Sequence, residues 1–159
     1  MSEQKDKGMR HFVAYHNRDA MGEISLPFQV ETRKPTRGLI GSVVWVVEGI
    51  GRSPKQYDLV SWFIVTRVEK SLRAEFETAA YGDGPDRHEF KERVRLNGFD
   101  WFPDFRTRMG NFAFGLQPVT NEEVVNRLLE IAASEDRTPG QPTRRPGPPS
   151  SLPATSERR

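Results

Sequence analysis

The sequence predicts an α+β fold in one domain: a strongly curved or closed mixed sheet of five to seven strands with one or two covering helices. Residues 43–48 and 59–69 are two apolar, β-branched runs that each carry a tryptophan and almost no charge. Such runs are typical of strands whose two faces are both covered. A short loop joins them, so we expect them to pair as neighbours at the centre of the sheet.

The remaining strands are predicted from weaker patterns. Residues 10–16 alternate well enough for a first strand, and a polar turn follows. Residues 73–80 form a polar-alternating strand, residues 81–86 a turn rich in glycine and proline, and residues 89–96 a further strand. Together with the two central runs, these segments account for the predicted sheet.

One helix is clear, at residues 121–133. Asn121 is a suitable N-cap, two glutamates occupy the first turn, and apolar residues recur at helical spacing. Before it, residues 97–104 read as a loop that is dense in aromatic rings.

Composition limits the domain organisation and the possible chemistry. We expect a flexible N-terminus at residues 1–8, one folded domain at 9–134 and a disordered Pro/Arg-rich tail at 135–159. The tail holds five arginines against three acidic residues, a net of +2, which is the net charge of the whole chain; the folded part is therefore neutral. No apolar run approaches the ~20 residues of a membrane span. Cysteine is absent, which excludes disulfides and thiolate metal sites. We expect a cytoplasmic monomer.

The sequence offers no convincing catalytic or metal site. The histidines His11, His16 and His88 have no pair at metal-ligand spacing on a helix, and His88 lies in a polar stretch where we expect it to be solvated. No acid/base pair stands out, and Asp58 has the pattern of an ordinary strand-edge carboxylate. We therefore expect neither a cofactor nor an enzymatic activity.

The aromatic residues divide into two groups. Trp45 and Trp62 lie within apolar strands and are expected in the core. Trp101, Phe102 and Phe105 lie in or next to the predicted loop, where they either plug the open end of the barrel or wall a pocket. Asn111 follows, with the donor and acceptor atoms that hydrogen bonding to a nucleobase edge requires.

Three segments resemble the PUA-like superfamily, in particular its EVE, ASCH and YTH branches. They are GSVVW at 41–45, VSWFIVTRV at 60–68, and HFVAYHN at 11–17, which is similar in place to the first strand of EVE domains. In the central segment 41–45, Ser42 stands where these domains usually have an acidic residue. The resemblance implies a pseudo-barrel whose open side holds a flipped or modified nucleobase between aromatic walls, often as the reader module of a modification-dependent restriction or RNA-binding system.

Nucleic acid, DNA or RNA, is therefore the expected partner, with a partner nuclease or other protein as a further possibility and no membrane. The predicted base-contacting residues are His16, Asn17, Ser53, Trp101, Phe102 and Asn111. The predicted phosphate-contacting residues are Arg18, Arg52 and Lys55. The alternative function is a non-catalytic protein-interaction adaptor that uses the aromatic loop and the basic tail. An enzyme acting on a nucleotide has the least support.

Overall fold

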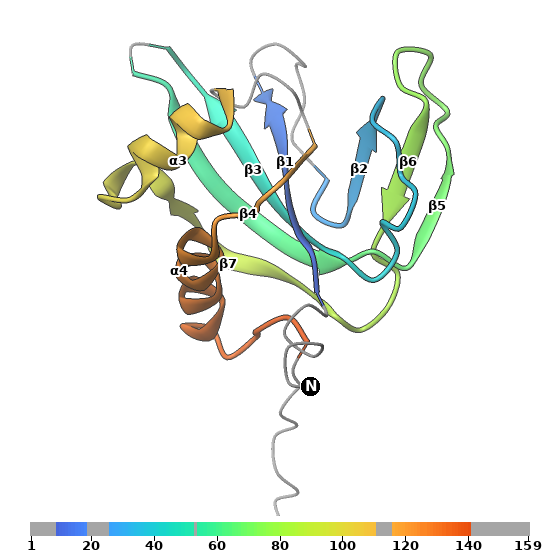
Figure 1. Cartoon of the computed structure of the whole chain (residues 1–159). Coiled ribbons are helices and arrows are strands. Elements are labelled where there is room, and N and C mark those ends of the chain that lie inside the picture. Colours follow the sequence, from blue (N-terminus) through green and yellow to red (C-terminus); the bar gives the residue numbers. More distant parts are fainter. Residues whose placement is uncertain (1–8, 19–25, 53, 111–115, 141–159) are drawn as a thin grey trace, which may run out of the picture.

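The computed structural model describes residues 9–18, 26–52, 54–110 and 116–140, which form an α+β domain built on two β-sheets (Figure 1). Sheet A has the strand order β7-β4-β3-β1-β8, and sheet B has the order β2-β6-β5. The strands of sheet A are β1 (His11–Asn17), β3 (Val43–Ile50), β4 (Gln56–Ile64), β7 (Arg87–Arg95) and β8 (Gln117–Pro118). The strands of sheet B are β2 (Gln29–Thr32), β5 (Arg67–Lys70) and β6 (Thr78–Tyr81).

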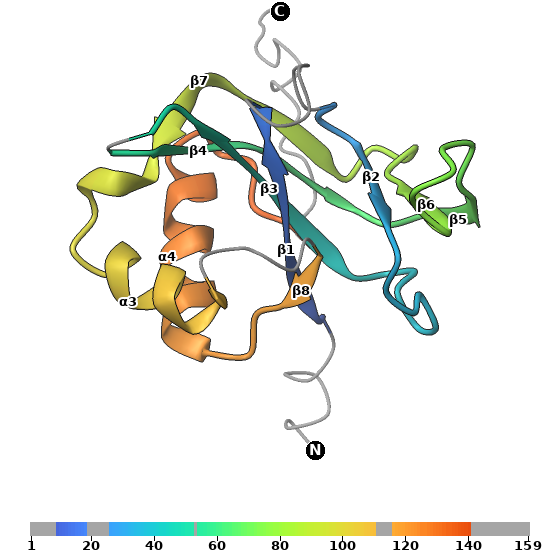
Figure 2. The same ribbon diagram turned by 90° about the horizontal axis from the view of Figure 1, so that it is seen from above.

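The helices lie on one side of sheet A, and sheet B lies toward its other side (Figure 2). They are α3 (Phe102–Arg108) and α4 (Glu122–Ala133), and the 3-10 turn η1 (Leu96–Gly98) precedes α3. The predicted fold class is thus confirmed at the level of a mixed α+β domain.

The two central strands are adjacent and central in sheet A, as predicted. β3 pairs antiparallel with β4, with Trp45 opposite Trp62, and parallel with β1 on its other side. Both tryptophans are buried, as expected of core residues. β1 also confirms the strand predicted at residues 10–16.

The strand count and the barrel differ from the prediction. The described residues form eight strands in two sheets and no closed barrel. The predicted strand 59–69 is divided, because β4 ends at Ile64 and β5 begins at Arg67 in the other sheet. The amide of Val65 still donates to the carbonyl of Ser42 beside β3, whereas the amide of Thr66 donates to Tyr81 of sheet B. The chain therefore changes sheet between residues 65 and 66.

Two further segments need correction. Most of residues 73–80 form a turn, closed by a hydrogen bond from the amide of Phe76 to the carbonyl of Arg73, and only the last residues enter β6. The aromatic segment 97–104 is not a loop throughout, since η1 and α3 occupy most of it. Pro103 stands in the first turn of α3, where its missing N–H leaves no helical hydrogen bond unmade.

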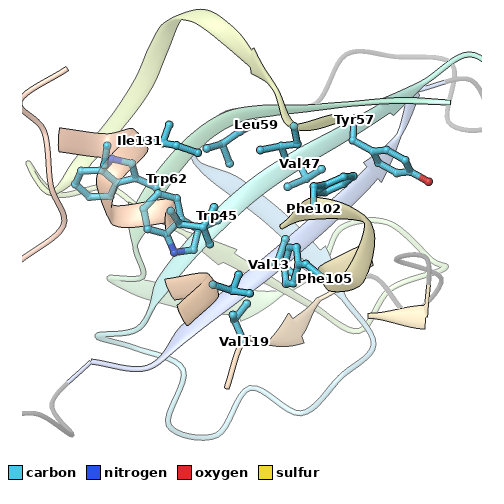
Figure 3. Packing of buried hydrophobic residues seen from close by; sticks show 14 of the residues in the cluster. Val13, Trp45, Val47, Tyr57, Leu59, Trp62, Phe102, Phe105, Val119 and Ile131 are labelled. Atoms are coloured by element: carbon cyan, nitrogen blue, oxygen red, sulfur yellow. The ribbon is translucent and has the colours of Figure 1, made fainter. Parts of the chain in front are cut away.

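Each face of sheet A has its own core, because successive side chains of a strand point to opposite faces. On the helix-covered face, Val13, Trp45 and Leu59 pack against Phe102 and Phe105 of α3 and against α4 (Figure 3). On the face toward sheet B the core is smaller and largely aliphatic. Its buried members are Phe12, Ala14, Leu39, Val44, Val46, Val60, Phe63, Val65, Ala80 and Leu116.

Helix α4 begins as predicted, with the side chain of Asn121 accepting hydrogen bonds from the amides of Glu123 and Val124 at 2.9 and 3.2 Å. The residues that follow it contact the body of the domain, although the tail was predicted to begin at residue 135. Glu135 Oε1 lies 2.6 Å from Nε2 of His88, whose side chain is 12% exposed. His88 is therefore paired and largely buried, and the prediction that it is solvated was wrong.

The predicted flexible N-terminus at 1–8 and residues 141–159 of the predicted tail lie outside the described residues. Within the described part of the chain, no helix is long and apolar enough to cross a membrane.

Candidate functional site

Four of the predicted binding residues lie at one end of sheet A, where β1 ends and the β3–β4 hairpin turns (Figure 1): His16, Asn17, Arg52 and Lys55. In the strand register His16 lies beside Glu48, Asn17 lies beside Gly49, and Gly49 faces Tyr57. Arg52 and Lys55 follow within the hairpin. The parallel pairing of β1 with β3 thus brings residues that are more than thirty positions apart to a common edge.

At this end the side chains fall into two rows on opposite faces of the sheet. Asn17, Gly49 and Tyr57 form the row on the helix-covered face, where Tyr57 belongs to the core that α3 covers. His16 and Glu48 occupy the alternate positions, so they lie on the face toward sheet B. The structure therefore separates two neighbouring predicted residues, His16 and Asn17.

The helix-side row is shaped by the absence of a side chain at Gly49. A Cβ atom at this position would lie 2.0 Å from the Tyr15 hydroxyl, so only glycine lets the Tyr15 ring cover the strand. The ring centroids of Tyr15 and Tyr57 are 6.0 Å apart. The ring centroids of Tyr57 and Phe102 are 5.3 Å apart (Figure 3). The guanidinium of Arg106 stands 5.7 Å from the Tyr57 ring centroid, within cation–π range.

The predicted aromatic wall is divided between core and rim. Phe102 is 1% exposed and Phe105 is 3% exposed, so both rings are core residues that cover the end of sheet A. Trp101 is half-buried, with its ring 5.4 Å from Phe99 and 6.0 Å from Phe105. Of the two rings proposed as a stacking wall, Trp101 is the one that retains exposed surface.

Asn97 joins the aromatic segment to the hairpin and was not predicted. Its Oδ1 accepts a hydrogen bond from the amide of Tyr57 at 2.7 Å, and its Nδ2 donates to the carbonyl of Lys55 at 3.1 Å. The side chain thereby continues the pairing of β7 with β4 by one more position. As a result, the segment that carries Trp101 is held beside the hairpin that carries Arg52 and Lys55.

On the other face, His16, Glu48, Asp58 and Arg95 lie side by side across four strands, and we call these four residues the charged row. Glu48 is fully buried and forms an ion pair with Arg93. Asp58 is 8% exposed and accepts a hydrogen bond from Nε of Arg95 at 2.5 Å. Sequence reasoning missed this row, although Glu48 is the single charge within β3 and was a signal of it.

In the part of the chain that the structure describes, no group of three or more His, Asp or Glu residues is placed to hold a metal ion. His11 lies at the opposite end of β1 and is structural: Trp45 Nε1 donates to its Nδ1 at 3.0 Å, and the two rings stack. Burial lowers the pKa of His11 because the charged form is poorly solvated there.

The other predicted residues are placed as follows. Arg18 follows β1 directly and is half-buried, Arg52 is exposed and Lys55 is half-buried. No ion pair is found for Arg52 or Lys55 among the described residues. Ser53 and Asn111 lie outside the described residues, so their predicted contacts with a base edge stay predictions.

Compared with known protein families, curated proteins and solved structures, the chain shows no significant match. The resemblance to PUA-like and EVE domains therefore stays a prediction, carried by the three sequence segments alone.

Proposed function

We propose that the chain is a nucleic-acid-binding reader domain of the PUA-like type, which accommodates a flipped or modified nucleobase at the hairpin end of sheet A. The observation that carries the proposal is the convergence of Asn17, Arg52 and Lys55 at this end, beside the Trp101 segment that Asn97 ties to the hairpin. Amide, cation and aromatic groups are the three kinds of group that such a site requires.

The energetics favour a local site over a broad basic face. Stacking of a base on an aromatic ring contributes ~1–3 kcal/mol, which is of the same order as the few kcal/mol that unstacking a base requires. The folded part of the chain is close to neutral, so non-specific attraction to phosphates is weak. Specific contacts at the site must then supply most of the affinity.

The alternative function, an adaptor that binds a protein through the aromatic segment, requires its rings to face outward. Phe102 and Phe105 are buried in the core instead. A patch of three exposed rings is therefore absent from this segment, and no contact in the described chain favours the adaptor over the reader.

The proposal is tested by fluorescence anisotropy with labelled single-stranded DNA and RNA, each with and without modified bases. Trp101→Ala is expected to weaken binding about tenfold, which corresponds to the loss of one stack. The matched control is Phe76→Ala, which removes a half-buried ring from the turn between β5 and β6. If both variants bind like the wild type while remaining folded, the reader proposal is refuted.

Lys55→Ala is expected to behave differently from Trp101→Ala. A phosphate contact carries no base information, so this variant should weaken binding to all sequences alike and reduce the slope of log K against log salt by about one. Lys70→Ala, at an exposed lysine of β5 in sheet B, is the control. A slope that is equally reduced by both lysine variants would indicate diffuse attraction rather than a contact at the hairpin.

A further inference from the structure

The guanidinium of Arg95 is held in one orientation by the buried carboxylate of Asp58. Its Nε donates to Asp58 Oδ1 at 2.5 Å; the Asp58 side chain is 8% exposed, whereas that of Arg95 is 48% exposed. The carboxylate thus lies inside and the guanidinium outside. No protein acceptor within the described residues contacts the two Nη groups of Arg95, so the outer edge of its planar fork remains available to a ligand.

The carboxylates next to Arg93 and Arg95 favour a neutral ligand over an anionic one. Glu48 pairs with Arg93 and Asp58 pairs with Arg95, so each guanidinium is balanced by a carboxylate. A phosphate placed on Arg95 would also meet the Asp58 carboxylate behind it, which weakens the attraction. A neutral ligand with two neighbouring hydrogen-bond acceptors takes full advantage of the oriented fork without this repulsion.

Among the nucleobases, guanine presents such a pair of acceptors, O6 and N7, on its major-groove edge, and arginine is their commonest specific partner. Adenine presents N7 next to an amino donor, which an arginine fork does not match. We propose that Arg95 reads a guanine of the bound strand, donating from its two Nη groups to O6 and N7, and that Asp58 is the residue that positions it. This inference rests on the proposed function and adds a base preference to it.

The position of Arg95 is consistent with the proposed site. Asp58 directly follows Tyr57, and Arg95 directly precedes η1, whose Asn97 holds the hairpin. Arg95 therefore lies at the same end of sheet A as Lys55, on the outer strand β7 and on the face opposite to that of Asn17. The pair is also preorganised, because Arg95 is already held by Asp58 before a ligand arrives.

The test uses the full chain and four single-stranded octamers that differ at one central base: guanine, inosine, 7-deazaguanine and adenine. Inosine retains both O6 and N7, whereas 7-deazaguanine lacks N7. The wild type is expected to bind the guanine and inosine octamers about tenfold more tightly than the other two. Both DNA and RNA series are measured by anisotropy.

Arg95→Lys is expected to remove this preference by weakening binding to the guanine and inosine octamers only. Lysine retains the positive charge and can still pair with Asp58, but it lacks the planar guanidinium fork. The matched control is Arg67→Lys: Nε of Arg67 also donates to an aspartate, Asp83, at 2.7 Å, but Arg67 lies on β5 in sheet B. Asp58→Asn is expected to reduce the guanine preference without weakening binding to adenine, because the charge of Arg95 remains while its orientation is lost.

Each result bears on a stated claim. If Arg95→Lys weakens the binding of all four octamers equally, Arg95 contacts the nucleic-acid backbone and the guanine assignment is overturned. A guanine preference that survives in Arg95→Lys would also overturn the guanine assignment. Binding that depends on Trp101 but shows no guanine preference would overturn this inference and leave the reader proposal in place. Failure of the wild type to bind any octamer or longer oligonucleotide would overturn both.

Discussion

The two faces of sheet A are built from the same strands but differ at the hairpin end. On the helix-covered face, the buried core is apolar and aromatic from Trp45 to Tyr57 and Phe102, and the polar Asn17 lies at the end of β1. The face toward sheet B is aliphatic over Val44 and Val46 and then changes to the charged row. A strand can therefore contribute to a continuous core on one face and present oriented polar groups on the other, because alternate side chains contact different elements.

The largest effect is expected on the helix-covered face. Phe102→Ala removes a fully buried ring and should lower the free energy of unfolding by about 3–5 kcal/mol. Trp101→Ala, one residue earlier and half-buried, should lower it by less. Urea denaturation of both variants measures the difference. Equal losses would mean that Trp101 is as much a core residue as Phe102 and would weaken its assignment as a stacking wall.

A smaller but still large loss is expected on the opposite face. Arg93→Ala removes the guanidinium that forms an ion pair with the buried Glu48 carboxylate and should destabilise the domain by about 3 kcal/mol. Replacing both residues together, Glu48→Met with Arg93→Met, should leave stability within about 1 kcal/mol of the wild type, since the buried carboxylate is removed together with its arginine. If the double variant is as unstable as Arg93→Ala, the pair contributes stability directly rather than orientation.

The next effect concerns the close approach between β1 and β3. Gly49→Ala would place a Cβ atom against the Tyr15 hydroxyl, so the Tyr15 ring must move, which should lower the free energy of unfolding by about 1–2 kcal/mol. Gly98→Ala is the control, because a Cβ atom there meets nothing within 4 Å. Thermal unfolding of the two variants tests this: indistinguishable melting temperatures would show that Tyr15 moves without loss.

The smallest effect is a pH dependence at the other end of the sheet. Burial lowers the pKa of His11 below its ordinary value of 6.5, so below that pH the unfolded chain binds more protons than the native one. The contribution of neutral His11 is complete above about pH 6.5 and is lost as the pH falls through 6.5 toward the lowered native pKa. Urea titrations at several pH values should show the wild type losing stability relative to His11→Gln on acidification. A constant difference between the two would refute the assignment.

Sequence patterns predicted the parts of the fold that depend on local order. The apolar runs of β3 and β4 and the Asn121 cap of α4 follow from burial and from hydrogen bonding within a few residues. The change of sheet at residues 65–66 has no glycine or proline to mark it. It depends on hydrogen bonds between this segment and residues 41, 42 and 81, which are distant in sequence.

The candidate site was predictable to a similar extent. Strand ends place Asn17, Arg52 and Lys55 together once β1 and β3 are paired. The pair of Glu48 with Arg93 was not predictable, because the pairing of β4 with β7 is irregular between Leu59 and Ser61 and shifts which residues meet. The helical turn around Phe102 was signalled by Pro103, which stands in the first turn of α3, and this signal in the sequence was overlooked.

The two-residue strand β8 has a consequence for how the chain assembles. It covers the outer edge of β1, with the amide of Val119 donating to the carbonyl of His11 at 2.8 Å. Strands β1 and β8 lie near the two ends of the domain sequence, so their contact closes the longest loop in sheet A. Closing such a long-range loop is slow. During synthesis, β1 emerges first, yet one of its edges stays unpaired until more than a hundred further residues have followed. We therefore expect the β3–β4 hairpin to form early, and amide exchange to report β8 as the last part of the sheet to close and the first to open.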